Sequence, residues 1–350
     1  MTELAARARD VLNVASPRNG APLIDSFGRR ISYLRLSVTD RCDLRCTYCM
    51  PERMTFLPKR EVLSLEELYD LASGFIERGV TKIRITGGEP LVRRDIIGLF
   101  DALGQRIGKG LEELTLTTNA TQLAGHAEAL FKSGVRRVNI SLDTLDRERF
   151  AELTRRDALP QVLDGIRAAQ EAGLKIKLNA VALKGVNEDE LPDLIGWAHG
   201  RNCEVTLIEV MPLGDVEEER LDQYLPLSDV RARLEEQWTL TDNAHKSGGP
   251  ACYVDVAETG GRLGFITPHT NNFCDGCNRL RVTATGQLYP CLGGGERVDL
   301  RAALRSDDPE VQLAAALDKT MLIKPERHQF RMDKRGAKPH LARHMSMTGG

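Results

Sequence analysis

The sequence lacks any long hydrophobic run and any excess of charge of one sign. No stretch of about 18 apolar residues occurs in it, so we expect no membrane-spanning helix, no signal peptide and a cytoplasmic location. Lys and Arg number 48 and Asp and Glu number 50, which gives a net charge of −2. This near-neutral charge predicts no general attraction to nucleic acid or to a membrane. An anionic ligand would therefore have to be bound by a local group of cations.

The sequence also lacks a phosphate-binding G-x4-G-K-[ST] loop and a set of cysteines spread along the chain. A bound phosphate would therefore be held by side chains rather than by a P-loop. Six of the eight cysteines fall in two tight groups, which in a chain of 350 residues indicates metal binding or reactive thiols rather than disulfides. Cys203 and Cys252 stand alone, and we interpret each as a small buried hydrophobic residue.

The first cysteine group, Cys42, Cys46 and Cys49, organises the prediction for the rest of the chain. Its C-x3-C-x2-C spacing lets three thiolates turn toward one point from a short loop. A cubane 4Fe-4S cluster has four irons, so three protein thiolates would leave one iron open to another ligand. A structural zinc site, or a disulfide beside one odd thiol, is an alternative, although zinc ligands are usually paired as C-x2-C.

Short apolar strands alternate with helical stretches after this loop. A capping box at Ser64-x-x-Glu67 predicts the start of the first helix, and Gly79, Gly134 and Gly173 stand where later helices would end. Six strands that alternate with helices predict an α/β fold with a parallel sheet, and six such units make an incomplete (β/α)6 TIM-type barrel. The predicted strands are 33–38, 82–86, 113–117, 137–141, 175–181 and 204–210.

The barrel is predicted to lie between two other segments. We expect residues 1–22 to be a mobile lead-in, residues 23–245 to form the barrel, and residues 246–350 to form a smaller α+β cluster-binding domain that ends in two glycines. In (β/α) barrels, ligands bind at the carboxyl ends of the strands. The cysteine loop, the GGEP turn at 87–90 and the strings TTN and SLD all follow predicted strands. We therefore expect them to face one mouth.

Cys274, Cys277 and Cys291 form a second group of three, with no fourth cysteine nearby. A structural zinc site normally has four ligands, so a histidine would have to complete it, and His269 is the candidate. The alternative is a second 4Fe-4S cluster with an open iron, which would face the first cluster across the mouth of the barrel. The spacing leaves both interpretations open.

Several cations gather at the same mouth. They stand on predicted strands or beside the second cysteine group, where a charged side chain costs free energy unless it is paired or faces a polar cavity. Convergent cations in a chain of near-neutral charge indicate an anionic substrate, and a polyphosphate would occupy several of them. These residues are Arg35, Lys82, Arg84, Lys177, Arg279 and Arg281.

The strings of sequence around these residues are LRLSVTDRCDLRCTYC, KIRITGGEPL, TTN, SLD, IEVMP and CDGCNRLRVT. With them, from about Leu23 to its end, the chain resembles the MoaA family, the GTP 3′,8-cyclases of molybdenum cofactor biosynthesis. The first string and the GGEP turn are similar to the radical S-adenosylmethionine (SAM) superfamily as a whole. The second cysteine group with NRLR, together with the terminal glycine pair, is specific to the family.

The resemblance implies the partial barrel of radical SAM enzymes and a reaction. It implies that an electron from the reduced first cluster splits SAM into methionine and a 5′-deoxyadenosyl radical, which removes the C3′ hydrogen of GTP. The carbon radical would attack guanine C8. Electron transfer from the second cluster and protonation would complete (8S)-3′,8-cyclo-7,8-dihydroguanosine 5′-triphosphate.

The resemblance also implies a role for individual residues of this sequence. Two 4Fe-4S clusters would be held by Cys42, Cys46 and Cys49 and by Cys274, Cys277 and Cys291. The residues that would contact SAM are Tyr48, Gly88, Ser141 and Met211. The residues that would hold GTP, with its guanine at the open iron of the second cluster, are Arg35, Arg84, Thr117, Lys177, Arg279, Leu280 and Arg281. Gly349 and Gly350 would enter the active site, where missing side chains permit a narrow passage.

One departure from the family concerns the triphosphate. Where members commonly read RFIE, this chain has TLIE, so Thr206 replaces an expected arginine. The loss of that cation affects the inferred phosphate binding more than the inferred radical chemistry. A nearby Lys or Arg would have to compensate for it.

The resemblance further implies partners. They are GTP, a reduced electron donor of the flavodoxin or ferredoxin type, the downstream cyclic pyranopterin monophosphate synthase and a second copy of the chain in a homodimer, with no nucleic acid or membrane. Two alternatives stay open at this point. One is a twin-cluster radical SAM enzyme that modifies a peptide, and the other is a non-enzymatic iron-sulfur or zinc-binding protein. Release of 5′-deoxyadenosine would distinguish enzyme from non-enzyme, and dependence on GTP would distinguish the two enzymes.

Overall fold

Six parallel strands in sequence order form the centre of the fold. The structure is a computed structural model, and it describes residues 20–214, 216, 220–269, 273–330, 341 and 343–349. Each central strand pairs in parallel with the next one along the chain. The six predicted strands are confirmed, and their ends differ from the prediction by one residue at most. They are β1 (Tyr33–Ser37), β2 (Lys82–Thr86), β3 (Glu113–Thr118), β4 (Arg137–Ser141), β5 (Lys175–Ala182) and β6 (Glu204–Glu209).

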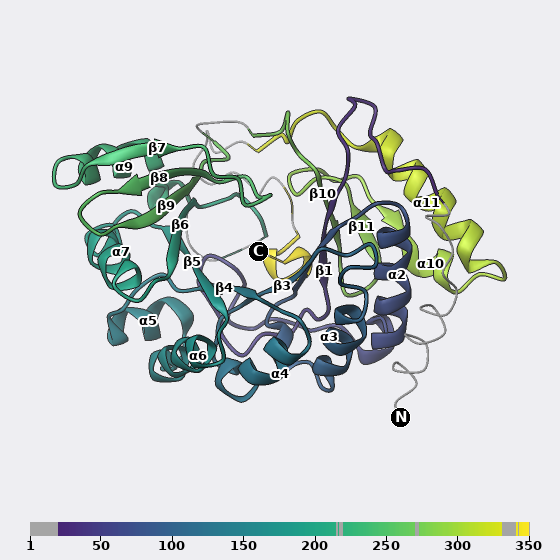
Figure 1. Cartoon of the computed structure of the whole chain (residues 1–350), viewed down its shortest axis with the longest axis horizontal. Helices are drawn as coiled ribbons and strands as arrows, with labels where there is room; N and C mark the ends of the chain where they lie inside the picture. Colours follow the sequence, from purple (N-terminus) through teal and green to yellow (C-terminus); the bar gives the residue numbers. More distant parts are fainter. Residues whose placement is uncertain are drawn as a thin grey trace.

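Helices connect these strands and lie along the outer side of the curved sheet (Figure 1). This is the arrangement that right-handed strand–helix–strand crossovers produce, and it confirms the predicted partial barrel. Among the described helices, none is both long enough and apolar enough to cross a bilayer. The connecting helices are α2 (Leu65–Glu77), α3 (Ile96–Gly104), α4 (Ala127–Lys132), α5 (Arg147–Thr154), α6 (Leu159–Glu171) and α7 (Leu191–His199), with short 3-10 helices η1 (Lys59–Glu61), η2 (Pro90–Val92) and η3 (Leu123–Gly125).

The C-terminal part of the chain extends this sheet at both edges. β10 (Arg279–Val282) pairs in parallel with β1, and β9 (Gly261–Ile266) pairs in parallel with β6. Beyond these two strands the outer strands are antiparallel, and they are β7 (Leu240–Asn243), β8 (Cys252–Val256), β11 (Gln287–Tyr289) and β12 (Val298–Asp299). The described sheet has twelve strands in the order β12-β11-β10-β1-β2-β3-β4-β5-β6-β9-β8-β7. A domain boundary near residue 245 stays a prediction, because strands from both sides of it share one sheet.

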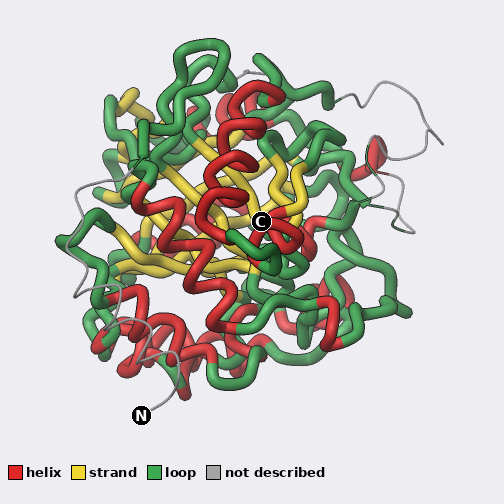
Figure 2. Tube along the Cα trace, turned by 90° about the vertical axis from the view of Figure 1, so that its right-hand side faces the viewer, coloured by secondary structure: helices red, strands yellow, loops and turns green. Residues whose placement is uncertain are grey.

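The remaining helices come from the same C-terminal part. Seen from the side that carries α10 and α11, helices lie in front of the strands (Figure 2). The last helix lies inside the curve of the central strands, near the C-terminal end of the chain (Figure 1). These helices are α8 (Arg220–Gln223), α9 (Leu227–Glu235), α10 (Leu300–Leu304), α11 (Pro309–Ile323) and α12 (Met345–Thr348).

Local sequence signals set several helix ends as predicted. The Ser64 side chain accepts a hydrogen bond from the Glu67 backbone at 3.1 Å, and the Glu67 side chain accepts one from the Ser64 backbone at 2.7 Å. This reciprocal capping box satisfies two backbone donors that the first turn of α2 leaves unpaired. Gly79, Gly134 and Gly173 follow helices with φ of +91°, +93° and +84°. Such left-handed conformations favour glycine over residues with a Cβ atom.

Alternation along the strands separates the hydrophobic core from the polar interior. On β1, Leu34 and Leu36 are fully buried in the core, and the intervening Arg35 lines a cavity inside the barrel. On β2, Ile83 packs into the same core and Arg84 lines the same cavity. Successive residues of a strand point to opposite faces. One face of the sheet therefore packs against the helices, and the other presents charge to the cavity.

The two solitary cysteines differ in their surroundings. Cys203 is 3% exposed and belongs to the hydrophobic core, as predicted. The prediction for Cys252 was wrong, because its side chain is exposed. Cys252 begins β8, which is the penultimate strand at one edge of the sheet, and its side chain points away from the side on which Tyr253 is buried.

Replacing Ser64 by Ala should lower the free energy of unfolding by about 1 kcal/mol, because the first turn of α2 loses its N-cap acceptor. Urea unfolding of the cluster-free protein, followed by circular dichroism, would measure this change. Ser64→Asp is the matched control, since aspartate also accepts at the N-cap and should change stability by only a few tenths of a kcal/mol. Equal losses in both variants would contradict the capping explanation.

Candidate active site

One cavity at the mouth of the barrel brings both cysteine groups together. It is also lined by nearly all of the residues that the sequence nominated for SAM and substrate. The segments that meet there come from both ends of the chain, which explains why no single stretch of sequence defines the site. The nominated residues that line it are Cys42, Cys46, Cys49, Cys274, Cys277, Cys291, Tyr48, Gly88, Ser141, Met211, Arg35, Arg84, Thr117, Lys177, Arg279 and Arg281.

Leu280 does not line this cavity. Its side chain is 0% exposed and packs in the hydrophobic core. Leu280 lies between Arg279 and Arg281 on β10, so strand alternation turns its side chain to the helical face. The side chain therefore does not reach the cavity, and the prediction that Leu280 holds GTP stays a prediction for its backbone alone.

The last described segment lies at the site, because Met345 and Ser346 line the cavity, and entry of the glycine pair into it stays a prediction. The Gly349 carbonyl accepts a hydrogen bond of 2.6 Å from Nη1 of Arg281. A Cβ atom at Gly349 would lie 2.0 Å from Oγ1 of Thr86, and the residue has a φ of +70°. A side chain is thus excluded here by close contact and by backbone conformation. Gly350 lies outside the described residues.

The GGEP turn supports the first cysteine loop through direct backbone packing. Gly88 N–H donates to the Thr39 carbonyl at 2.9 Å, and Glu89 N–H donates to the Arg41 carbonyl at 2.8 Å. A Cβ atom at Gly87 would lie 2.6 Å from the Thr39 carbonyl oxygen, and one at Gly88 would lie 2.4 Å from that of Arg41. The two glycines are therefore required for this loop to approach the turn closely.

Glu89 fixes the neighbouring turns, and sequence reasoning did not nominate it. Its carboxylate is 0% exposed and accepts hydrogen bonds from Asn119 N–H at 2.6 Å and from Thr118 Oγ1 at 2.9 Å. A third bond of 3.0 Å comes from Leu91 N–H. Burial raises the pKa of Glu89 to about 7, although these donors favour the charged form. Glu89 thus joins the turn after β2 to the end of β3.

Tyr48 is held in place by Asp143, the aspartate of the SLD string. The Tyr48 hydroxyl donates to Oδ2 of Asp143 at 2.6 Å, and Val181 N–H donates to Oδ1 at 2.8 Å. Burial raises the pKa of Asp143 to about 6. The string SLD had been noted at a strand end, but its contact with Tyr48 joins residues too far apart in sequence to be predicted.

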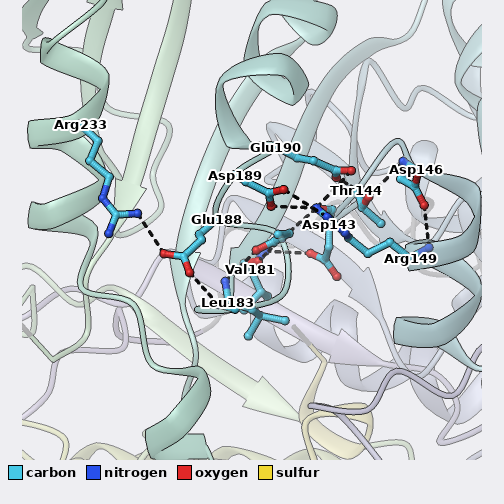
Figure 3. A network of polar contacts seen from close by, with 12 residues as sticks. Asp143, Thr144, Asp146, Arg149, Val181, Leu183, Glu188, Asp189, Glu190 and Arg233 are labelled. Carbon is cyan, nitrogen blue, oxygen red and sulfur yellow. Dashed lines mark hydrogen bonds and ion pairs between the residues drawn. The ribbon is translucent and has the colours of Figure 1, made fainter.

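Polar contacts behind Asp143 fix the loops after β4 and β5 (Figure 3). Asn187 Nδ2 donates to the Asp143 carbonyl at 2.8 Å, and Arg149 pairs with Asp189 at 2.9 Å. Glu188 accepts from Gly185 N–H at 2.8 Å and pairs with Arg233 of α9 at 2.9 Å (Figure 3). These contacts connect the mouth to the outer helices. These contacts therefore hold the backbone around Asp143 in place.

The two cysteine groups lie in different electrostatic surroundings. Burial, and then the charge of Glu89, raise the pKa of the Cys42 thiol. Burial likewise raises the pKa of Cys46, whereas at Cys277 the effect of burial is outweighed by Arg279 and Lys324, which lower its pKa to about 7. Ligation deprotonates a thiol by supplying positive charge. The first group therefore depends on metal for its ionisation, and the second has protein cations beside it.

The donor sets fit iron-sulfur clusters better than single ions. Among the described residues, no three His, Cys, Asp or Glu side chains converge closely enough to bind one metal ion. A cubane cluster binds each thiolate to a different iron, so its ligands are spread apart. His269 Nε2 donates to the Val210 carbonyl at 3.0 Å, and its ring packs edge-on against Tyr224. These contacts disfavour the zinc alternative, in which His269 would complete the second group.

A row of buried cations crosses the cavity floor. Arg281, Arg35 and Arg84 stand opposite one another on β10, β1 and β2. Among the described residues, the buried Nε groups of Arg35 and Arg84 have no hydrogen-bond partner, nor has Oγ1 of Thr117. Buried donors are normally satisfied, so these groups need an acceptor that the described part of the chain does not provide. An anionic substrate supplies such acceptors.

Tyr33 lies beneath this row on β1. Its ring centroid is 5.6 Å from the Arg84 guanidinium carbon and 5.0 Å from the Lys82 ammonium. Burial raises the pKa of Tyr33, but Arg84 and Arg35 more than offset this effect and the pKa falls to about 8. The floor of the cavity is thus strongly electropositive, and its positive potential is what an anion would meet.

Lys177 belongs to a second polar group that sequence reasoning missed. Its ammonium donates to the Tyr253 hydroxyl, which in turn donates to Oγ of Ser247 at 2.7 Å. Lys82 donates to the Ser247 carbonyl at 2.9 Å and pairs with Glu113 at 2.7 Å. The SGGP sequence at 247–250 by itself indicates only a turn. Its position against two lysines depends on how β8 pairs with β9.

Thr206 lies beside this group. It is 0% exposed, and its Oγ1 has no hydrogen-bond partner among the described residues. A Cβ atom at Gly264 would lie 2.9 Å from Oγ1 of Thr206 and 2.9 Å from the Tyr253 ring. The Tyr253 ring therefore adjoins the position at which the family commonly has arginine. The Tyr253 hydroxyl accepts a hydrogen bond from Lys177. Tyr253 thus adjoins both Lys177 and the position of Thr206.

Comparison with solved structures agrees with this fold. The chain superposes on SuiB of Streptococcus suis bound to S-adenosylmethionine with a TM-score of 0.57 and 18% identity, which covers 82% of this chain and 67% of that one. It also superposes on anSMEcpe with bound AdoMet with a TM-score of 0.55 and 14% identity, which covers 84% of this chain and 81% of that one. At such low identity these similarities concern the fold alone.

Comparison of the sequence with families and curated proteins is more specific. Residues 36–198 match the radical SAM superfamily, and residues 203–330 match Molybdenum Cofactor Synthesis C. The chain is 73% identical over 328 residues to the GTP 3′,8-cyclase of Erythrobacter litoralis, a match that covers 94% of this chain and 98% of that protein. It is 60% identical over 329 residues to the GTP 3′,8-cyclase of Rhizobium etli, with 94% of each chain covered. The chain therefore belongs to the GTP 3′,8-cyclase family of radical SAM enzymes.

Proposed function

We propose that this chain converts GTP to (8S)-3′,8-cyclo-7,8-dihydroguanosine 5′-triphosphate, the first step of molybdenum cofactor biosynthesis. The observation that carries the proposal is the row of buried arginines, in which the Nε groups of Arg35 and Arg84 have no partner among the described residues. This row lies in one cavity with two groups of three cysteines. A triphosphate offers several charged oxygens to such donors. Relatives that match nearly the whole chain at 57–73% identity are GTP 3′,8-cyclases, which supports the same conclusion.

Each cysteine group would hold one 4Fe-4S cluster. Cys42, Cys46 and Cys49 would hold the cluster that binds SAM, and Cys274, Cys277 and Cys291 would hold the second. When bound and reduced, the first cluster with SAM would supply the 5′-deoxyadenosyl radical that removes the C3′ hydrogen of the substrate. The task of the protein is then to position SAM and substrate and to exclude other hydrogen donors.

Residues on the side of the cavity that carries the first cysteine group would position SAM. Tyr48, Gly88, Ser141 and Met211 line that side, and Asp143 orients Tyr48 through its hydrogen bond of 2.6 Å. Because Asp143 is itself fixed by Val181 N–H, Tyr48 has little freedom to turn. Glu89 and the two glycines before it would hold the cysteine loop at a fixed distance from the same site.

Residues of the floor would position GTP. Arg35, Arg84 and Arg281 would hold phosphate oxygens, and Lys177, oriented by Tyr253, would add the charge that Thr206 does not provide. Arg279 and Thr117 would bind the remainder of the nucleotide, with guanine toward the second cysteine group. α12 and Gly349 would narrow the cavity and limit access of water. Ordered donors of this kind need no reorganisation during reaction.

The chain would act with further partners in the cytoplasm. A flavodoxin or ferredoxin type of donor would supply electrons, and a cyclic pyranopterin monophosphate synthase would consume the product. We also infer a homodimer. These inferences depend on membership of the family rather than on a described surface. They would be tested by sedimentation of the purified protein and by reduction with each candidate donor.

The substrate is tested with GTP deuterated at C3′. The cluster-reconstituted, reduced protein should release deuterated 5′-deoxyadenosine from SAM, because the proposed pose places C3′ next to the SAM side of the cavity. Anaerobic incubation followed by mass spectrometry measures the label. Unlabelled 5′-deoxyadenosine, formed equally without GTP, would contradict the proposal and favour a radical SAM enzyme with another substrate, such as a peptide. No 5′-deoxyadenosine at all would favour a protein without this enzymatic activity.

The affinity for GTP should fall as the pH rises from about 6 to about 8. Burial, and then the charge of Arg84, lower the pKa of Lys177 to about 7. The ammonium form, which attracts phosphate, dominates below that pH and is lost above it, so binding weakens by up to about tenfold per pH unit above the pKa. Equilibrium binding of GTP to the reconstituted protein would measure the change.

Lys177→Arg separates this effect from titration of the nucleotide itself. Arginine stays charged throughout this range, so the variant should lose the pH dependence that Lys177 contributes. Lys175→Arg is the matched control, because Lys175 lies on the same strand and is exposed. The same pH dependence in the wild type and in Lys177→Arg would rule out a contact between Lys177 and the phosphates.

Replacing Gly88 by Ala should remove the first cluster and retain the second. The added methyl group would lie 2.4 Å from the Arg41 carbonyl oxygen, so the cysteine loop would have to move. We expect the iron content to fall to about half and cleavage of SAM to be lost, since each cluster contributes equally to the iron. Gly125→Ala is the control, because a Cβ atom there meets no atom within 4 Å. Full iron content in Gly88→Ala would contradict this role of the turn.

A further inference from the structure

Two buried cations hold the second cysteine group from the side away from the cavity. Arg29 donates through Nη1 to the Cys274 carbonyl at 2.9 Å and to the Glu326 carbonyl at 2.6 Å. Its Nε pairs with Asp25 at 2.6 Å, so the charge of Arg29 is neutralised by a neighbouring carboxylate. Arg29 thus ties the backbone of the cysteine group to the segment that follows α11 without adding net charge.

Lys324 is the second of these cations, and it directly follows α11. It is 3% exposed, and its Nζ lies 2.8 Å from the Pro290 carbonyl and 3.2 Å from the Arg279 carbonyl. The third contact of Nζ is with Sγ of Cys277 at 3.6 Å. An ammonium has three donors, and all three are used here. The two carbonyls belong to residues next to cysteines of the group or close to them, so Lys324 connects both parts of the C-x2-C-x13-C array.

The charges of Lys324 and Arg29 have different neighbours. In the described part of the chain, no Asp or Glu oxygen lies within 4.0 Å of Nζ of Lys324, in contrast to Arg29. A buried ammonium whose acceptors are all neutral is costly, because it has lost its water. Of its three acceptors, the Cys277 sulfur is the one that can carry a negative charge. Ligation of iron requires that sulfur as a thiolate, so the lysine gains its counter-charge when the group is ligated.

We propose that Lys324 is a positioning residue for the second cysteine group, which holds its cluster in place and raises the reduction potential of that cluster. Reduction adds a negative charge to the cluster, and a fixed positive charge beside a ligating sulfur stabilises the reduced form. This inference rests on the proposed function, because it takes Cys274, Cys277 and Cys291 as cluster ligands. It goes beyond that function in assigning the control of the potential to a residue outside the cavity.

Arg279 is also close to Cys277, but its position differs. Its Nη2 lies 3.9 Å from Sγ of Cys277, and it lines the cavity, where bound substrate would share its charge. Lys324 does not belong to the residues that line this cavity. Its effect on the cluster should therefore be present with or without substrate, which distinguishes it from that of Arg279.

The test compares Lys324→Gln, Lys324→Arg and Lys319→Gln in full-length protein with both clusters reconstituted. Lys319 is an exposed residue of α11, so its replacement removes the same charge at a distance from the cysteines. Iron per chain and a redox titration followed by electron paramagnetic resonance would be measured without substrate. The spectrum of the first cluster is recognised because it changes when SAM is added. Neither readout depends on turnover.

In Lys324→Gln we expect the reduced-to-oxidised ratio of the second cluster, at a given applied potential, to fall by tenfold or more. For a one-electron couple a tenfold change corresponds to 59 mV. Lys324→Arg and Lys319→Gln should stay within about threefold of the wild type, because the charge at Cys277 is retained. Loss of second-cluster iron in Lys324→Gln, with retention in Lys324→Arg, would equally support the proposal.

Two results would overturn the role of Lys324. One is a Lys324→Gln protein with the iron content and potential of Lys319→Gln, and the other is a Lys324→Arg protein as impaired as Lys324→Gln. A variant with Cys274, Cys277 and Cys291 all replaced by Ala tests the premise separately. If that variant kept its full iron content, the ligand assignment in the proposed function would fail and this inference with it. If it lost the second cluster and Lys324→Gln was unaffected, the inference alone would fail.

Discussion

The site depends on one constraint, which is that several cations are buried on the inner face of a sheet whose outer face is hydrophobic. Arg35 and Arg84 occupy adjacent strands at the same level, and their Nε groups lack acceptors among the described residues. Like charges at this distance repel, and burial removes the water that would screen them. Burial lowers the pKa of Arg84 to about 10, which shows how unfavourable this environment is for a cation. The rigid barrel holds the arginines there, and an anionic ligand relieves the cost.

The two cysteine groups are held in place by different kinds of contact. The first group is set by backbone contact, since Gly87 and Gly88 allow the loop to lie against the turn and Glu89 ties that turn to β3. The second group is held by side-chain cations, since Arg29 donates to its backbone and Lys324 contacts one of its sulfur atoms. A cluster at the first group would be surrounded by carboxylates, and one at the second by positive charge. Two clusters of the same composition would therefore differ in electrostatic surroundings, and with them in redox properties.

Rigid support extends from the mouth to the outer helices. Asp143 orients Tyr48, and the contacts of Arg149 and Glu188 hold the loops from which Asp143 projects (Figure 3). On the opposite side, Tyr253 orients Lys177 next to the small side chain of Thr206. In each case a residue from one segment of the chain orients a functional group on a distant segment. Positioning of this kind is what radical chemistry requires of a protein, because a displaced substrate would expose other hydrogens to attack.

The strands, the capping box, both cysteine groups and the cations of the floor could be predicted from the sequence, because each of these follows from local spacing or alternation. Alternation also explains why Leu280 belongs to the core although its neighbours line the cavity. The contacts of Tyr253 with Lys177, of Asp143 with Tyr48 and of Lys324 with Cys277 could not be predicted, because they depend on the folded structure. Each of those contacts joins segments separated by dozens of residues or more. Cys252 was misjudged for the same reason, since its exposure depends on the place of β8 near the edge of the sheet. Spacing along the chain fixes which face a side chain occupies, whereas its partners depend on which strands the fold brings together.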